Sequence, residues 1–507
     1  MSAILARSGT AAALVFFSAQ GALAGLTAQE VWDGWKSYLT GTGYAVEASE
    51  TLSGGTLTIS GLTMTAGEAA AEGSARISLP EIRLEENGDG SVSVLMPADM
   101  PVAFAFTGPE EDVSGTLIYG HDGSPVTVTG DASEMTYTYA APELTLDLKE
   151  LKADGEVIPP EAAQFSMALQ QAAAETTMKA DGTRTYGQEL SAAGLTYHLA
   201  FVDPENEAKG SFKGALEGLA FSGSSTIPVG LESPDMAALL DAGAGFGGRF
   251  TFTSGSGAIA GSGDGESFAM ETRSGGGAVD VSLNGERLTY DLSQRDAEVN
   301  ISGTEMPFPL SLRMAEAGLR LMMPVTGTGA EQDFALGVTL RDFALPEMFW
   351  GMVDPTGVLP HDPATLVLDI AGKGKLLFDI FDPESIAPVE SGSQPPGEVN
   401  ALTVKELRLS AAGAELTGTG DFTFDNEDLE SFGGIPAPSG EANLMLTGAN
   451  ALLDKLIQLG VMADSDAMGV RMMMGMLAVP GEGEDSLKSR IEITEDGKIL
   501  ANGQRLK

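Results

Sequence analysis

The sequence of 507 residues contains no cysteine and only three histidines. Without thiols the chain forms no disulfide and no thiolate metal site, so its stability has to come from burial along a long chain. The histidines, His121, His198 and His361, lie in a turn, a strand-like run and a loop beside proline. None has a second histidine at helical spacing, so we expect structural or surface residues and predict no metal site.

Basic residues are scarce as well. The chain has 28 Lys and Arg against 72 Asp and Glu, which gives a formal net charge of −44. A charge of this sign repels phosphate backbones and anionic lipid surfaces, and it excludes nucleic acid as a partner. Because the acidic residues are dispersed along the chain, we interpret them as a means of solubility and not as a cation site.

Catalytic motifs are missing too. The sequence has no Gly-x-Ser-x-Gly elbow and no phosphate-binding glycine loop that ends in Lys-Ser/Thr. Carboxylate pairs of the kind that glycosidases use exist in any acidic protein, and nothing in this sequence singles one out. We therefore predict no enzymatic activity, no catalytic residues and no cofactor.

Long hydrophobic runs are absent, and the first one is short. Arg7 precedes an apolar run from Ala11 to Ala19, and Ala22 and Ala24 then supply the small residues that signal peptidase requires. Spanning a bilayer takes roughly 20 apolar residues. This pattern predicts a cleavable signal peptide over residues 1–24, with cleavage after Ala24, and export to the periplasm.

The remaining chain offers no better candidate for a membrane segment. Its most apolar stretch, Met468 to Val479, is interrupted by Gly469, Arg471 and Gly475, which favours a buried helix. We predict no transmembrane segment in the mature chain.

Glycine and proline, in contrast, are abundant, with 65 and 25 residues. They separate short runs in which apolar and polar residues alternate, as in half-buried strands. The turns at residues 87–90 and 263–265 have the Asn, Asp and Gly that tolerate positive φ in hairpins, and they lack the ligand spacing of calcium loops. The pattern predicts a mainly β protein of elongated, bent antiparallel sheets with a few short helices.

Three helices are expected. Thr27 and Glu30 form a capping box ahead of Trp32, Trp35 and Leu39 on one face, which predicts an amphipathic helix over residues 27–40. Helical structure is also expected over residues 233–242 and 450–478, where the first part begins after Asn450 and stops at Gly460 and the methionine-rich segment follows.

A local pattern recurs in the sequence. Two apolar residues separated by one position are followed by two polar or glycine residues, and then by two more apolar residues separated by one position. An extra residue reverses the alternation, so the apolar side chains stay on one face only if the strand bulges. We therefore expect bent strands. The pattern occurs at Leu57–Met64, Leu146–Ala153, Val338–Leu345, Leu402–Leu409 and, in part, Leu216–Phe221.

The segment 383–400 is rich in proline, glycine and serine and has no apolar periodicity. It predicts an exposed linker. The expected organisation is a signal peptide at 1–24, a β-rich region with its N-terminal helix at 25–382, this linker, and a C-terminal β unit with helices at 401–507.

Methionines cluster near the end of the chain, at residues 472–474 and 476. Thioethers are ligands for Cu(I), but consecutive positions on a helix point in different directions and do not converge on one ion. Flexible methionines also pack against varied apolar groups. We predict that Met472, Met473 and Met476 border an apolar ligand.

Two parts of the sequence resemble a known family. The segment Phe343 to Pro355 with its continuation to Gly372, and the ending from Gly448 to Gly503, are similar to an exported alphaproteobacterial family catalogued as domain of unknown function 2125. The resemblance extends to the Trp32 and Trp35 helix, and so covers nearly the whole mature chain. That family has no established activity, so the resemblance implies no site residues.

The alternating strands and the closing hairpin more distantly resemble AsmA-like envelope proteins. This resemblance implies long curved sheets that form apolar grooves, associated with lipid movement and outer-membrane homeostasis. It is a likeness of fold alone. AsmA-like proteins usually keep an N-terminal membrane anchor, whereas residues 1–24 here have the pattern of a cleaved segment.

Two hypotheses of function follow. In the first, a bent sheet presents one apolar face as a groove for lipid or another apolar ligand in envelope homeostasis, with the methionine-rich helix as its wall or cap. In the second, the protein is a structural scaffold or interaction protein of the envelope, and its apolar faces pack as an ordinary core. An apolar face open to solvent favours the first hypothesis, and two sheets packed face to face favour the second.

Overall fold

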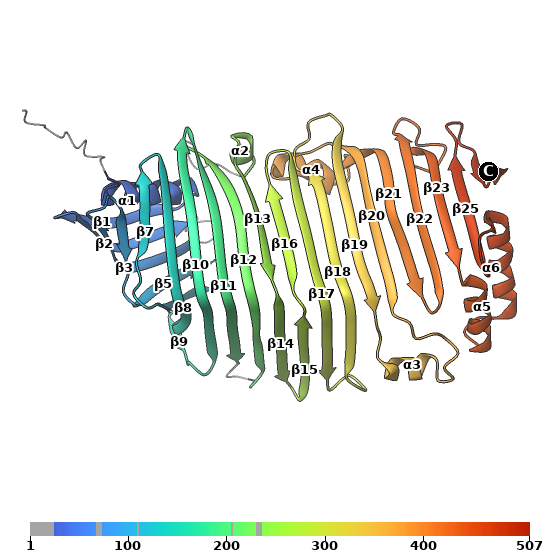
Figure 1. The fold of residues 1–507 in the computed structure, drawn as a ribbon, viewed down its shortest axis with the longest axis horizontal. Helices are drawn as coiled ribbons and strands as arrows, with labels where there is room; N and C mark the ends of the chain where they lie inside the picture. Colours follow the sequence, from blue (N-terminus) through green and yellow to red (C-terminus); the bar gives the residue numbers. More distant parts are fainter. Residues whose placement is uncertain (1–24, 67–73, 109–110, 204–205, 230–235, 507) are drawn as a thin grey trace, which may run out of the picture.

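The computed structural model describes residues 25–66, 74–108, 111–203, 206–229 and 236–506. In this part of the chain, 27 strands form one antiparallel sheet with six short helices. The sheet is drawn out along the long axis of the molecule, and at its N-terminal end the first strands cross behind β7 and β8 in the view of Figure 1. The predicted mainly β, elongated antiparallel fold is confirmed. The proposed signal peptide lies outside the described residues.

Most strands are long, and successive strands of the chain lie side by side. The first half of the sheet consists of β1 Ala45–Ser53, β2 Thr56–Ala66, β3 Ser74–Glu86, β4 Val92–Leu95, β5 Asp99–Thr107, β6 Asp112–Gly120, β7 Val126–Asp131, β8 Glu134–Ala153, β9 Glu156–Ile158, β10 Ala163–Asp181, β11 Thr183–Val202, β12 Lys209–Pro228, β13 Gly245–Phe252 and β14 Ser254–Gly263. The second half consists of β15 Glu266–Ser274, β16 Gly277–Leu283, β17 Arg287–Gly303, β18 Leu310–Pro324, β19 Gln332–Phe343, β20 Ala364–Leu376, β21 Gly397–Ala411, β22 Ala414–Asp425, β23 Ala437–Thr447, β24 Val479–Pro480, β25 Ser486–Ile493, β26 Ile499–Ala501 and β27 Gln504–Arg505.

At several places in the sheet, two short strands lie end to end and pair with the same long strand. β4 and β5 both pair with β3, and β6 and β7 both pair with β8. In the same way β13 and β14 both pair with β12, and β15 and β16 both pair with β17. Each such pair is one long strand broken near its middle. The predicted hairpin turns at 87–90 and 263–265 join β3 to β4 and β14 to β15 and are confirmed.

The unbroken strands bend at the same level. Gln171, Gly218, Asp296 and Asp342 have positive φ angles of 50°, 58°, 48° and 52°. The registers of the strands between them place these residues in one row across the sheet. We call this row the crease. Residues other than glycine adopt the left-handed backbone conformation at a cost of about 1 kcal/mol or more. The crease therefore requires a conformation that Gln171, Asp296 and Asp342 do not favour by themselves.

The crease keeps apolar side chains on one face. Leu216 lies on one side of it in β12, and Phe252 lies on the other side in β13. A Cβ atom built on Gly255 would lie 3.0 Å from Leu216 Cδ2 and 3.1 Å from Phe252 Cε2, so both side chains share a face. The bulges expected from the recurring apolar pattern are therefore confirmed. Register shifts or positive φ angles occur at Gly61, at Lys149 opposite Thr116 and Leu117, at Gly218, at Asp342 and between Val404 and Leu407.

Two prolines also lie in the crease. Pro80 in β3 faces Gly61 across the register gap, and Pro142 in β8 faces Gln171. Proline has no N–H to donate to a ladder, so it fits where the hydrogen bonding between two strands is interrupted.

The helices lie at the ends and edges of the sheet (Figure 1). The predicted helix over 27–40 is confirmed as α1, including its capping box, and α2 falls within the predicted 233–242. The predicted 450–478 consists of two helices, α5 and α6. The six helices are α1 Ala28–Gly41, α2 Met236–Asp241, α3 Glu347–Val353, α4 Pro383–Glu390, α5 Ala449–Gln458 and α6 Asp464–Leu477.

Two helices were not expected from the sequence. α3 has only seven residues and begins after Pro346 without a side-chain cap. α4 occupies the first part of the predicted linker 383–400, and Gly397 begins β21, so residues 383–396 connect the neighbouring strands β20 and β21. Asp382 accepts a hydrogen bond from Glu384 N, and proline follows it at the first helical position, a start signal that the proline-rich composition obscures. Separate folding of residues 401–507 stays a prediction.

The crease generates a prediction about stability. Replacing Gly218 by valine forces a β-branched residue into the left-handed region, with its Cβ overlapping the Thr253 side chain. We expect the free energy of unfolding to fall by about 2–4 kcal/mol, measured by denaturant titration.

The matched control is Gly261→Val in neighbouring β14, where the new Cβ has only an ordinary contact, 3.8 Å from Lys209 O. Valine suits an extended strand, so the control protein is expected to keep its stability. Equal losses in both variants would show that the crease does not require its backbone conformation.

Candidate functional site

One face of the sheet, which we call the apolar face, carries apolar side chains from the N-terminal strands to β23. Rows of directly paired residues on both sides of the crease show this, because paired residues point to the same face. On one side, a row reads Phe165, Leu199, Phe212, Ile259, Met270, Ile301 and Leu310. On the other side, a row reads Ala174, Leu190, Phe221, Phe250, Val279, Leu292, Leu319, Val338, Leu368 and Leu407.

The opposite face is polar. Its cross-strand neighbours include the ion pairs of Arg341 with Glu316 at 3.1 Å and of Arg249 with Asp280 at 3.1 Å. All four side chains are more than a third exposed. Exposed pairs of this kind contribute at most about 1 kcal/mol each, so their main consequence is a solvated surface.

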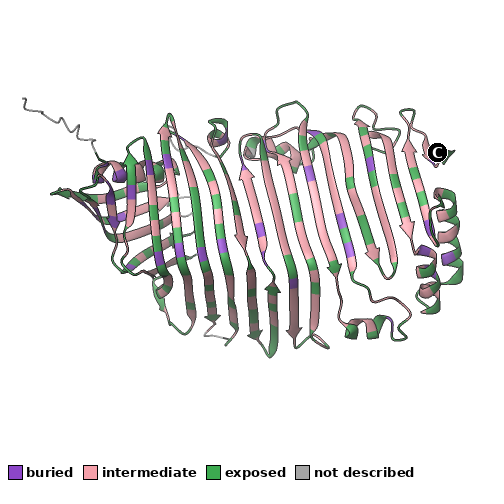
Figure 2. Ribbon diagram, in the orientation of Figure 1, coloured by how far each residue is buried: buried purple, intermediate pink, exposed green. Residues whose placement is uncertain are grey.

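Much of the apolar face is open to solvent. Phe201 is 55 % exposed, Phe268 45 %, Leu199 44 %, Phe212 43 % and Ile259 37 %. These five residues, which we call the open patch, lie together on β11, β12, β14 and β15 on one side of the crease. Half-buried and exposed residues prevail along the middle strands (Figure 2). Among the described residues, no second sheet packs against this face.

At the N-terminal end, α1 covers the same face. Val31 and Trp32 of this helix are completely buried. Met178, which shares its face with Ala174, is 2 % exposed beneath the helix. The apolar face is thus closed where a helix lies on it. The buried cluster comprises Leu26, Ala28, Val31, Trp32, Leu57, Ile59, Leu62, Ile82, Leu84, Val92, Val94, Val128, Met135 and Met178.

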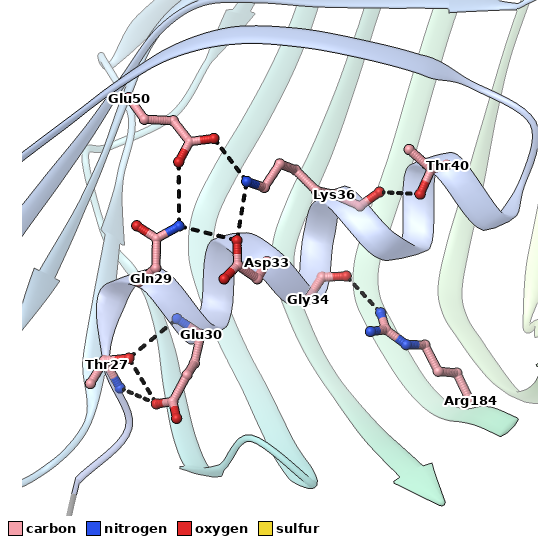
Figure 3. A network of polar contacts seen from close by, with 9 residues as sticks. All are labelled: Thr27, Gln29, Glu30, Asp33, Gly34, Lys36, Thr40, Glu50 and Arg184. Atoms are coloured by element: carbon pink, nitrogen blue, oxygen red, sulfur yellow. Dashed lines mark hydrogen bonds and ion pairs between the residues drawn. The ribbon is translucent and has the colours of Figure 1, made fainter. Parts of the chain in front are cut away.

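Hydrogen bonds fix the start of α1 (Figure 3). Thr27 Oγ1 accepts a hydrogen bond from Glu30 N at 3.2 Å, and Thr27 N donates to Glu30 Oε2 at 2.9 Å. Ala28 N donates to Glu86 Oε1 of β3 at 3.0 Å. The capping box satisfies free backbone donors of the first turn, and Glu86 ties that turn to the sheet.

Charged residues hold the middle of α1 (Figure 3). Lys36 Nζ lies 2.8 Å from Glu50 Oε1 of β1 and 3.1 Å from Asp33 Oδ1. The hydrogen bond with Glu50 raises the pKa of Lys36, and the bond with Lys36 lowers the pKa of Glu50. Arg184 extends from β11 and donates from Nη1 to Gly34 O at 2.9 Å.

A second cluster covers part of one edge. Leu240 of α2 packs with Leu283 and Val325, and Leu288, Ile380 and Phe381 surround them. Leu283 and Leu288 are paired residues of the apolar face. The segment around α2 and α4 therefore shields the apolar face at this edge.

The methionine-rich helix α6 lies beside α5 at the C-terminal end of the sheet (Figure 1). Met472 is 68 % exposed, Met473 53 % and Met476 57 %. Ala467 is buried, and Arg471 of the same helix donates to Asp454 Oδ1 of α5 at 2.6 Å. The three methionines are thus available to a ligand or a partner. Their contact with an apolar ligand stays a prediction.

The residues considered for chemistry do not converge. His121 lies 3.0 Å from Pro97 O, His198 is on the polar face, and His361 stacks on Trp350 with ring centroids 4.5 Å apart. The described residues contain no group of three or more His, Asp or Glu side chains placed to bind a metal ion. None of the helices described is long and apolar enough for a membrane span. The sequence led us to propose an apolar face as the binding surface, but the residues of the open patch were not identified, because exposure, unlike alternation, has no signal in a single sequence.

The core beneath α1 generates a prediction about pH. Burial raises the pKa of Tyr137 to about 12 from its ordinary value of 10.0, and burial also raises the pKa of Tyr139 and Tyr186. The unfolded chain loses these protons at lower pH than the folded protein, so stability is complete below pH 10 and falls as pH rises towards 12. We expect Tyr137→Phe to make this fall shallower in urea titrations at several pH values. An unchanged slope would contradict the assignment.

A family model described as "Uncharacterized protein conserved in bacteria (DUF2125)" matches residues 235–502. The matched range includes α3, α5, α6 and the segments whose sequence resembles that family, but it does not reach the Trp32 and Trp35 helix, so it is shorter than expected. No curated protein and no solved structure matches the chain. Since the match covers more than half of the 507 residues, the chain belongs to the DUF2125 family of uncharacterised bacterial proteins.

Proposed function

We propose that this protein binds lipid or another apolar ligand on its apolar face and acts without catalysis in the cell envelope. The observation that carries the proposal is one continuous face that is buried beneath α1 and open in the middle of the sheet. Soluble proteins rarely expose contiguous apolar surface of this extent unless it is a binding site. Covering a fully exposed side chain of the size of Leu or Phe stabilises by about 1.5–3 kcal/mol, so a ligand on this face gains affinity from burial alone.

The arrangement of the helices supports this proposal. α1 closes the apolar face at the N-terminal end, and the segment around α2 and α4 shields one edge. A bent sheet with such partial covers presents an apolar surface to a ligand while limiting contact with bulk solvent. The alternative function, a scaffold or interaction protein whose apolar faces pack away as an ordinary core, would not leave the open patch exposed.

The proposal includes export. Residues 1–24 have the charge, apolar run and small-residue site of a signal peptide, so the mature protein is expected to begin at Gly25 and to fractionate with the periplasm. N-terminal sequencing of the protein from its own cells checks this part. An intact Arg7 segment in the membrane pellet would contradict it.

The function is tested by two neighbouring substitutions that place the same charge on opposite faces. Ile259→Asp puts a carboxylate into the open patch, and Ala260→Asp puts one on the polar face. We expect the first variant to bind an uncharged fluorescent acyl-ester probe about tenfold more weakly, because a buried unpaired charge is costly, and the second to bind normally. Native mass spectrometry of both proteins should show lipid only on the second.

Binding of an uncharged ligand should also be nearly insensitive to salt, because burial of apolar area carries it. If the parent protein takes up no probe and carries no lipid, the binding function fails and the scaffold becomes the better hypothesis. A further variant with Met472, Met473 and Met476 replaced by Asp tests whether α6 borders the ligand. Normal binding in that variant would remove α6 from the site.

A further inference from the structure

We propose that the apolar face selects lipids with uncharged or zwitterionic head groups and discriminates against anionic lipids. This inference rests on the proposed binding function and names its ligand class. Three observations support this inference. The part of the apolar face formed by β10 to β19, which we call the floor, offers no cation that lacks a partner, and its polar atoms near the open patch are neutral hydroxyls. The turns and strand ends beside the open patch, which we call the rim, are acidic.

The floor is almost free of charge. Along strands β10 to β19 between the turns, the residues whose register places them on the apolar face are apolar, glycine or uncharged polar, with two exceptions, Arg184 and Glu266, the first residue of β15. The Arg184 guanidinium already donates to Gly34 O of α1. A phosphate or carboxylate placed on this surface would lose water without gaining a cationic partner, which is strongly unfavourable.

Polar atoms next to the open patch are suited to an uncharged oxygen. A Cβ atom built on Gly257 would lie 2.9 Å from Thr272 Oγ1 and 3.9 Å from the Tyr197 hydroxyl. Neither hydroxyl has a hydrogen-bond partner among the described residues, and Tyr197 also packs on Phe212 of the open patch, with ring centroids 4.9 Å apart. An ester or hydroxyl oxygen over Gly257 would be within reach of these donors.

The rim beside the open patch is acidic. Phe201 lies near the end of β11, and Phe268 lies near the start of β15, just after the turn at 264–265. Glu207 just before β12, Asp264 in the turn between β14 and β15, and Glu266 at the start of β15 are all exposed. We call these three residues the rim acids. Lys209 is the basic residue close to them in sequence.

The head group of a lipid bound on the open patch has to lie at this rim, because the floor cannot solvate it. An anionic head group there has the same sign of net charge as the three rim acids, whereas a zwitterion or a neutral group has no net charge. At about 8 Å in water each like charge costs roughly 0.5 kcal/mol and Lys209 offsets about one of them, so the discrimination is about fivefold or more at low salt and much less at high salt.

The experiment uses the full-length protein and an uncharged fluorescent acyl-ester probe. Phosphatidylcholine and phosphatidylglycerol with identical acyl chains, each in neutral detergent micelles, compete for the probe at low and at high salt. We expect phosphatidylcholine to compete about 5- to 10-fold better at low salt and the difference to shrink at high salt. The triple variant Glu207→Gln, Asp264→Asn, Glu266→Gln should lose the preference.

A second triple variant separates the rim from the net charge. Asp147→Asn, Glu175→Gln and Glu271→Gln remove the same number of charges from exposed positions of the polar face, and this protein should keep the preference. Equal competition by both lipids with the parent protein, or loss of the preference in this control, overturns the inference while the binding function stands. Failure of the parent protein to bind the probe overturns both.

Discussion

Successive side chains of a strand point to opposite faces of a sheet, and this structure depends on keeping that alternation in phase along strands of up to 20 residues. A strand this long in a twisted single layer has to bend. The crease provides the bend by a residue in the left-handed region or by a gap between two strands. Because neighbouring strands break at the same level, they stay paired on both sides of it. Without the crease, one half of each strand would turn its apolar residues to the other face.

The contrast between the N-terminal end and the middle of the apolar face follows from what covers it. Beneath α1, Leu57 and Ile59 have almost no exposed area, whereas Phe201 and Phe268 are about half exposed. The residue types are alike, so the difference lies in the covering element and not in the sheet. Lys36 and Arg184 anchor α1 by polar contacts at its margin, which leaves the apolar contact between helix and sheet uninterrupted. The N-terminal end thus shows that this face accepts an apolar occupant.

The sequence predicts the fold class because alternation, glycine and proline report directly on strands and turns. The Leu57–Met64 pattern even identifies the bulge at Gly61, since an apolar face has to continue past an inserted pair. α4 escaped prediction because its start, Asp382 followed by proline, lies in a segment whose composition is typical of loops. Whether Phe212 faces solvent or a second sheet depends on long-range packing, and alternation is the same in both cases. The open patch was therefore beyond sequence analysis, while Met472 was proposed from residue chemistry alone.

The acidic charge and the open apolar face belong together physically. An exposed apolar surface promotes association between copies of a protein, and a sheet with a free edge promotes it further. A formal net charge of −44 opposes such association, because every encounter between two copies is repulsive over the range that salt permits. Along β10 to β19 the charges lie on the polar face and the turns, apart from Arg184, which donates to Gly34 O of α1, and Glu266 at the rim. The same distribution that keeps copies apart therefore leaves an apolar surface free for a small ligand that carries no negative charge.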